Sequence, residues 1–142
     1  MRDQTVVLVV DDDQSELGYY YRVLAWAGFK VVTAVDGLEA LDLLRLGDFD
    51  MVVADIKMPY LDGYELYRQA REEGRLAKIP FLFVTAYEAG SDVRTYGERM
   101  GAGPHLTKPV APEALIASVN RHLEKSYPSV IEGTPDNAIQ SD

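Results

Sequence analysis

Short apolar runs alternate with amphipathic segments along most of this chain, and this order constrains the fold more than any other feature. Five runs, most of them rich in Val, Ile, Leu or Phe, have the length of β-strands and occur at residues 5–10, 29–34, 49–54, 79–84 and 105–107. A segment with helical spacing of apolar residues follows each run. This alternation predicts an α/β fold, in which a five-stranded parallel sheet is doubly wound by right-handed crossovers.

Capping signals define several of the predicted helices. Asp36–Glu39 and Asp62–Glu65 both have the spacing of a capping box, which places each aspartate just before a helix. The helix after the second box is expected to run to about residues 73–74. Residues 88–100 are only weakly helical, because two glycines interrupt the segment at about 1 kcal/mol each relative to alanine.

Composition excludes several classes of function. The chain has 23 acidic residues against 14 Lys plus Arg, a formal net charge of −9, so we expect no direct binding to nucleic acid. It has no cysteine, which excludes disulfides and thiolate metal sites. No apolar run is long enough to cross a bilayer and no signal peptide is evident, so we expect no membrane contact and a cytoplasmic location.

The same composition indicates the domain organisation. Residues 1–125 are expected to form one domain, since this length supports a single two-faced core. Residues 126–142 are rich in Pro, Ser, Gly, Asn and Asp and contain no Lys or Arg. We therefore expect a flexible C-terminal tail or linker there.

Reactive side chains follow four of the five predicted strands. The carboxyl ends of parallel strands lie at one edge of a sheet, so we expect Asp11, Asp12, Asp55, Thr85 and Lys108 to converge. Three crowded carboxylates repel one another unless a cation relieves them, and hard oxygen ligands suit Mg²⁺. The lysine is a point-charge partner for phosphate, and the threonine supplies a hydroxyl donor. The set predicts a carboxylate, Asp55, that accepts a phosphoryl group as an in-line nucleophile.

Each of these residues also has an ordinary structural interpretation. Asp55 has the position of a turn or N-cap residue, and Asp11–Asp13 have that of acids at a helix start. Thr85 could cap a strand end, and Lys108 could be a solvated surface lysine. The functional interpretation rests on finding all of them at successive strand ends.

Four segments in order resemble the receiver domain of two-component response regulators, particularly those of chemotaxis, over about residues 5–125. They are VVLVVDDD, VVADIKMPYLDG, FLFVTA and LTKPV. The resemblance implies a flavodoxin-like receiver fold and a signalling domain that catalyses only its own phosphorylation and dephosphorylation. It implies transfer to Asp55 from a histidine kinase or a histidine phosphotransfer protein, and a downstream protein target or a separate output domain.

The resemblance also implies roles for individual residues. Mg²⁺ would be held by Asp12, Asp55 and the backbone carbonyl of Lys57, with Asp11 acting mostly through water. Thr85 and Lys108 would bind the phosphoryl oxygens. Asp13 lies outside the acidic pair of the family and is expected only to start a helix.

A conformational switch is the last implication of the resemblance. Thr85 would couple the phosphoryl group to an aromatic residue on the fifth strand, and His105 stands where tyrosine or phenylalanine is more usual. The alternative for His105 is a half-exposed histidine at the sheet edge. The glycine-bearing segment 88–103 would be the responsive region, because switching elements have low local stability; the alternative is a poor helix held by packing. We also hypothesise that Lys57 and Tyr87 shield the acyl phosphate from hydrolysis.

Three rival functions give different expectations. A haloacid-dehalogenase-like phosphatase would use Asp11 as its nucleophile, but it needs an acidic pair after its lysine, and Lys108 is followed by PVAPE. A nucleotide or flavin binder needs backbone N–H groups near phosphate after the first strand, where three aspartates would repel it. A protein-interaction module without phosphoryl transfer would leave the acidic edge unused.

Overall fold

Five parallel strands form one sheet in the computed structural model, which describes residues 4–86, 99, 101 and 105–126. The strands are Val6–Val10 (β1), Lys30–Ala34 (β2), Met51–Asp55 (β3), Phe81–Thr85 (β4) and Leu106–Thr107 (β5). Their order across the sheet is β2-β1-β3-β4-β5, and every pair is parallel. The predicted fold class is confirmed, and the predicted strand boundaries agree within about two residues.

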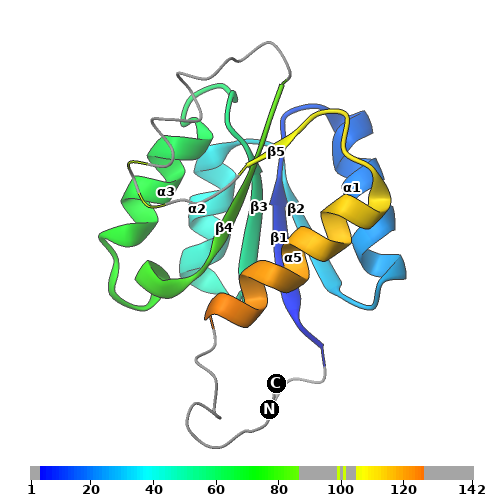
Figure 1. The fold of residues 1–142 in the computed structure, drawn as a ribbon. Coiled ribbons are helices and arrows are strands. Elements are labelled where there is room, and N and C mark those ends of the chain that lie inside the picture. The colour runs from blue at the N-terminus through cyan, green and yellow to red at the C-terminus, as the bar shows by residue number, and fades with distance from the viewer. Residues whose placement is uncertain (1–3, 87–98, 100, 102–104, 127–142) are drawn as a thin grey trace, which may run out of the picture.

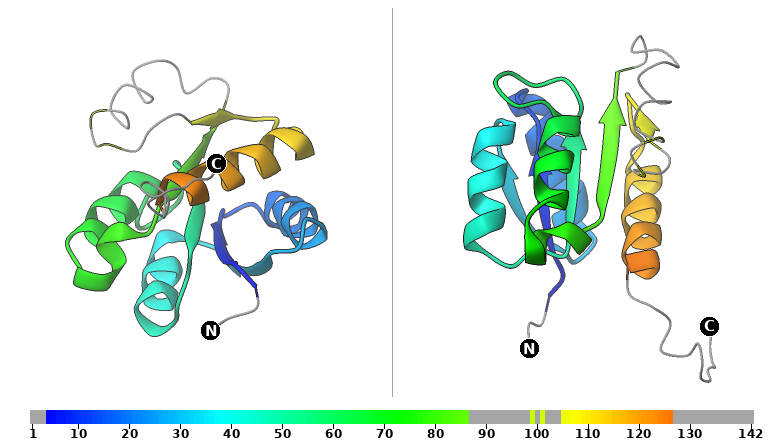
Figure 2. Two further views of the ribbon diagram at one scale, coloured as in Figure 1. Left: turned by 60° about the horizontal axis from the view of Figure 1, so that its bottom comes forward. Right: turned by 90° about the vertical axis from the view of Figure 1, so that its left-hand side faces the viewer.

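The helices cover both faces of this sheet (Figure 1). They are Gln14–Trp26 (α1), Gly37–Leu46 (α2), Gly63–Arg71 (α3), the 3₁₀ helix Gly74–Lys78 (η1) and Pro112–Ser126 (α5). Figure 2 shows α2 and α3 on one side of the sheet and α5 on the other, so the domain has three layers.

Burial on both sides explains why the central strands are continuous apolar runs. Every residue of β1, β3 and β4 is buried, and successive side chains enter opposite cores. One core lies under α2, α3 and η1, and the other lies under α1 and α5. From the strands, the first core receives Leu8, Val10, Val52, Ala54, Phe81 and Phe83. The second core receives Val7, Val9, Met51, Val53, Leu82 and Val84.

The two predicted capping boxes have different outcomes. At α3 the box is complete: Asp62 Oδ1 accepts from the Glu65 N–H at 2.8 Å, and Glu65 Oε1 accepts from the Asp62 N–H at 3.2 Å. At α2 the prediction is wrong in one half, because Glu39 Oε1 accepts from the Val35 N–H at 2.8 Å. Asp36 has φ −160°, whereas Asp62 has φ −77°. The two turns therefore present different backbone N–H groups to the glutamate carboxylate three residues after each aspartate.

The predicted end of α3 is also wrong. The helix stops at Arg71, and η1 follows it over Gly74–Lys78. Arg75 in η1 donates to the carbonyl oxygens of Leu44, Arg45 and Gly47 at the end of α2, at 3.3, 2.8 and 2.9 Å. These unpaired carbonyl groups need donors, and a tertiary contact that is not visible in local sequence supplies them.

Several expectations lie outside the described residues. Tyr87, most of the segment 88–103 and the tail after Ser126 belong to this group. Among the helices that are described, none combines the length and the apolar character that a bilayer crossing requires.

Candidate functional site at the carboxyl edge of the sheet

Asp11 and Asp55 occupy the point where the strand order reverses. The chain passes from β1 to β2 on one side and then to β3 on the other, which leaves a crevice at the carboxyl ends of β1 and β3. Asp55 is the last residue of β3, and Asp11 follows β1 directly. The Asp11 backbone N–H donates to the Ala34 carbonyl oxygen at 3.2 Å, which extends the pairing with β2, and the Asp11 side chain is buried.

Three carboxylates converge in this crevice. Asp11, Asp12 and Asp55 each offer an oxygen atom within 4.8 Å of the others. Asp11 is 1% exposed and Asp55 9%, whereas Asp12 lies at the surface. Carboxylate oxygens at this spacing match the ligands of a hard divalent cation such as Mg²⁺. Lys57, the other predicted ligand, follows β3 by two residues, and its side chain is exposed.

Lys108 brings the positive charge of the site. The backbone N–H of Lys108 donates to the Thr85 carbonyl oxygen at 2.9 Å, so this residue continues the pairing of β5 with β4. Its Nζ lies 3.2 Å from Asp55 Oδ2 and 3.4 Å from Asp11 Oδ2. The predicted convergence of Asp11, Asp55 and Lys108 is therefore present as direct contacts.

Thr85 lies at the same edge. Asp55 is paired with Val84 in the β3–β4 register, so Thr85 lies one residue beyond Asp55 on the neighbouring strand. It is buried, and its hydroxyl donates to the Ala86 carbonyl oxygen at 3.5 Å.

His105 is half-buried and faces α3. Its Nε2 lies 2.7 Å from the hydroxyl oxygen of Tyr64, and the centroid of its ring lies 5.3 Å from that of Phe83. The ring is thus held against aromatic side chains of the sheet and α3. The partial burial fits the alternative of a half-exposed histidine at the sheet edge, and the contact with Tyr64 was not foreseen from the sequence.

Burial sets the electrostatics of the crevice. It raises the pKa of Asp11 to about 7, with Glu16 and Asp55 adding to the rise and the Asp13 N–H and Lys108 opposing it. Burial also raises the pKa of Asp55, against the effect of the Lys108 ammonium. For Lys108, burial lowers the pKa, but the carboxylates of Glu16, Asp55 and Asp11 outweigh it and the net pKa is raised. The site therefore holds more negative charge than one lysine neutralises.

Stability in metal-free buffer should depend on pH through Asp11. Its carboxyl has a higher pKa in the folded protein than in the unfolded chain, so protonation favours folding. We expect the free energy of unfolding to rise as pH falls from about 8 to about 5. Asp11→Asn should raise it at pH 8 by on the order of 2 kcal/mol, and this gain should shrink toward pH 5. Urea unfolding with a chelator measures both effects.

Asp42→Asn is the matched control for this prediction. Asp42 is exposed on α2, so its replacement should change the unfolding free energy by less than about 0.5 kcal/mol at either pH. If Asp11→Asn followed the wild-type pH dependence, the burial of an ionised Asp11 would not be the cause of it.

Glu16 is the site residue that the sequence analysis missed. Its carboxylate forms an ion pair with Lys108 Nζ from the first turn of α1. Asp13, as expected, only starts the helix, since its Oδ1 accepts from the N–H groups of Ser15 and Glu16. A signal was available: Glu16 precedes the buried Tyr20 by four residues, so both lie on one face of the helix.

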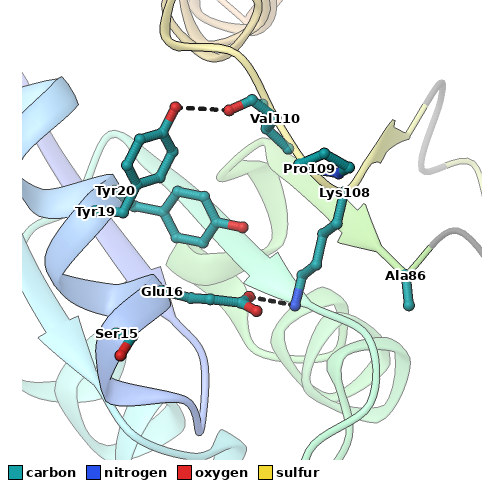
Figure 3. Close-up of a pocket in the computed structure, with 8 residues that line it drawn as sticks. All are labelled: Ser15, Glu16, Tyr19, Tyr20, Ala86, Lys108, Pro109 and Val110. Atoms are coloured by element: carbon teal, nitrogen blue, oxygen red, sulfur yellow. Dashed lines mark hydrogen bonds and ion pairs between the residues drawn. The ribbon is translucent and has the colours of Figure 1, made fainter.

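An open pocket of about 740 Å³ lies beside this ion pair (Figure 3). It separates the start of α1 from the segment that joins β5 to α5. Its lining consists of Ser15, Glu16, Tyr19, Tyr20, Ala86, Lys108, Pro109 and Val110.

Comparisons with known proteins agree on one family. A family model described as the response regulator receiver domain matches residues 7–120. Response regulator MprA of Mycobacterium sp. (strain KMS) is 41% identical over 133 residues, which are 94% of this chain and 56% of that protein. The chain thus spans about half the length of the curated relatives it matches.

Solved structures give the same result. A putative response regulator from Chloroflexus aurantiacus J-10-fl superposes with a TM-score of 0.81 at 30% identity, over 86% of this chain and 99% of that one. The chemotaxis protein CheY4 of Vibrio cholerae superposes with a TM-score of 0.78 at 32% identity, over 84% and 98% of the two chains.

Proposed function

The chain belongs to the response regulator receiver domain family, and we propose that it accepts a phosphoryl group on Asp55 in a Mg²⁺-dependent reaction. The donor would be the phosphohistidine of a histidine kinase or a histidine phosphotransfer protein. The observation that carries the proposal is the position of the Lys108 ammonium between the carboxylates of Asp55 and Asp11. This arrangement supports a phosphoryl site with one attacking oxygen and one positive charge beside it.

Each residue has a defined task in this reaction. A carboxylate oxygen of Asp55 attacks phosphorus in line, the P–N bond of the donor breaks, and the imidazole leaves. Lys108, 3.2 Å from Asp55 Oδ2, would donate to an oxygen atom of the incoming phosphoryl group. Asp11, Asp12 and the carbonyl group of Lys57 would hold the cation beside Asp55. When bound, Mg²⁺ neutralises negative charge on the phosphoryl oxygens.

Asp55 suits the role of nucleophile better than Asp11, the residue that a phosphatase of the haloacid-dehalogenase type would use. Asp11 Oδ1 accepts from the Asp13 N–H at 2.9 Å, and Asp11 is 1% exposed. Asp55 is more accessible at 9%. Asp55 also accepts a hydrogen bond, from Lys108, so its greater accessibility is what favours it as the nucleophile.

The proposal is tested by mapping the phosphorylated residue. The protein is incubated with acetyl phosphate and Mg²⁺, its intact mass is measured, and the adduct is located by peptide mapping after reductive trapping. We expect one labile phosphoryl group on Asp55, and none in the presence of a chelator. Label on Asp11 would instead support the phosphatase-type chemistry, and no label at all would overturn the proposal.

Phosphorylation would act as the signal rather than as a step in metabolism. In this proposal Thr85 moves toward the phosphoryl group, His105 changes position, and the face that includes β5 and α5 changes its affinity for a partner. The partner would be a downstream protein or an output domain, in the cytoplasm. The net charge of −9 supports a protein partner rather than direct contact with nucleic acid.

Tyr64→Phe should make the switch easier to operate. A movement of His105 away from α3 must break the 2.7 Å contact between its Nε2 and the Tyr64 hydroxyl. Losing one such hydrogen bond changes an equilibrium by about 0.5–1.5 kcal/mol, so we expect the switched population of His105 to rise about two- to tenfold. NMR of the histidine ring measures this with and without beryllofluoride, a phosphoryl mimic. His122, the other histidine of the chain, is the internal reference.

Tyr67→Phe is the matched control on the same helix. The Tyr67 hydroxyl accepts from Arg71 at 2.8 Å, and its ring packs on Phe81 and Phe83. This variant should leave the His105 resonances close to those of the wild type. Equal His105 populations in Tyr64→Phe and the wild type would show that the hydroxyl does not restrain the ring.

A further inference from the structure

Lys108 has three carboxylate partners rather than two. Its Nζ contacts the carboxylates of Asp55, Asp11 and Glu16. Its ammonium group donates hydrogen bonds to Asp11 and Asp55 and forms an ion pair with Glu16. Any new acceptor, such as a phosphoryl oxygen, has to displace one of them.

The packing of α1 fixes the position of Glu16. The buried side chains of Leu17 and Tyr20 anchor this face of the helix in the core. The Tyr19 hydroxyl donates to the Val110 carbonyl oxygen at 2.6 Å, which ties α1 to the segment just after Lys108. Figure 3 shows Glu16 extending from α1 toward the end of the Lys108 side chain.

Glu16 is also the partner that can release Lys108 most easily. The side chain of Glu16 is 36% exposed, against 1% for Asp11 and 11% for Asp55. The Glu16 Oε1 atom that contacts Lys108 is itself buried, so losing the lysine requires the carboxylate to turn outward, toward the exposed part of this side chain. At Asp11 and Asp55 the same loss would leave a buried carboxylate unpaired.

We propose that Glu16 is a positioning residue that holds Lys108 in the unphosphorylated protein and competes with the phosphoryl group on Asp55 for its ammonium. The inference rests on the function proposed above and adds a residue from α1 to it. Glu16 thereby lowers the affinity of the site for a phosphoryl group, both by occupying the lysine and by placing a negative charge beside it. The pocket next to the pair leaves room for the released carboxylate to turn away.

Glu16→Gln tests the inference, because glutamine keeps the size of the side chain and removes its charge. With saturating Mg²⁺, we expect the dissociation constant of beryllofluoride, followed by fluorine NMR, to fall about three- to fivefold. The initial rate of Asp55 phosphorylation by acetyl phosphate should rise by a similar factor. Glu113→Gln is the matched control, since Glu113 is an exposed acid in the first turn of α5, and it should match the wild type.

Glu16→Asp separates the effect of the contact with Lys108 from the effect of the negative charge. Aspartate keeps the negative charge but is one methylene shorter, so it should lose the contact with Lys108. An affinity close to that of Glu16→Gln supports the competition for Lys108. If Glu16→Asp binds beryllofluoride like the wild type while Glu16→Gln binds it more tightly, the charge alone acts. That result would overturn the proposed competition for Lys108.

The outcomes distinguish this inference from the proposed function. If wild type and Glu16→Gln are both labelled on Asp55 at equal rates and bind beryllofluoride equally, Glu16 has no such role and the proposed function stands. Weaker binding by Glu16→Gln would also overturn the inference, since Glu16 would then assist the phosphoryl group. Absence of label in the wild type would overturn the proposed function, and the inference with it.

Discussion

Asp55→Asn is expected to abolish the labile phosphoryl adduct that acetyl phosphate and Mg²⁺ form on the wild type. An amide has no carboxylate oxygen with which to attack phosphorus, whereas its size and its carbonyl oxygen are those of the original side chain. Removing the nucleophile of a group of residues that act as a unit lowers the rate by about a thousandfold or more. Intact mass after timed incubation is the measurement.

Asp55→Asn should lose the phosphoryl adduct without unfolding. Burial raises the pKa of Asp55, so an ionised Asp55 is a cost to the folded protein in the absence of a cation. The free energy of unfolding of Asp55→Asn in chelator should therefore equal or exceed that of the wild type. A variant that loses the adduct while keeping its stability has lost chemistry and not structure.

Asp62→Asn is the matched control for Asp55→Asn. Asp62 is the N-cap of α3, just beyond the site, and asparagine is an equally good N-cap. We expect this variant to be phosphorylated like the wild type. Persistence of the adduct in Asp55→Asn would place the phosphoryl group on another residue, and its loss in both variants would point to damage of the loop.

Gly63→Ala is expected to destabilise the fold by about 2–3 kcal/mol. Gly63 begins α3, and its N–H donates to the Ile56 carbonyl oxygen at 2.8 Å. A Cβ atom at this position would clash with the carbonyl oxygen of Asp55 and would lie 3.0 Å from the Cα of Ile56. Both obstacles are backbone, so relief requires moving the end of β3. The decrease should appear in urea unfolding, and it should come with slower phosphorylation because Asp55 moves.

Gly74→Ala is the control for that substitution. Gly74 begins η1, and a Cβ atom built there meets no atom within 4 Å. The alanine should change the unfolding free energy little, or raise it by about 0.4–1 kcal/mol by restricting the unfolded chain. Equal stability of Gly63→Ala and Gly74→Ala would contradict the close approach of α3 to β3.

Much of the fold was predictable because two-sided burial leaves a strong pattern. The residues of β1, β3 and β4 are all buried, so those strands appear as unbroken apolar runs. The convergence of Asp11, Asp55 and Lys108 followed from the rule that parallel strands end at one edge. Neither step needed any knowledge of particular side-chain contacts.

Apart from the local contact of Glu39 with Val35, the features that were missed depend on partners distant in sequence. The segment η1 is held by Arg75, which caps the end of α2 about 30 residues earlier. His105 meets the hydroxyl of Tyr64, and Lys108 meets Glu16 across the crevice. A local pattern reports which face of an element is buried, but not which side chain of another element lies opposite it.

The strand–helix order, the parallel sheet and the acidic edge with its lysine follow from local amino-acid patterns, because they depend on the periodicity of burial and on chain direction. The ion pair of Lys108 with Glu16, the contact of His105 with Tyr64 and the need for glycine at position 63 appear only in the folded molecule. The two groups of features differ in the range over which they are set. Backbone periodicity is set over a few neighbouring residues, whereas an ion pair, a hydrogen bond or a steric limit is set by the separation of two atoms after the elements have packed.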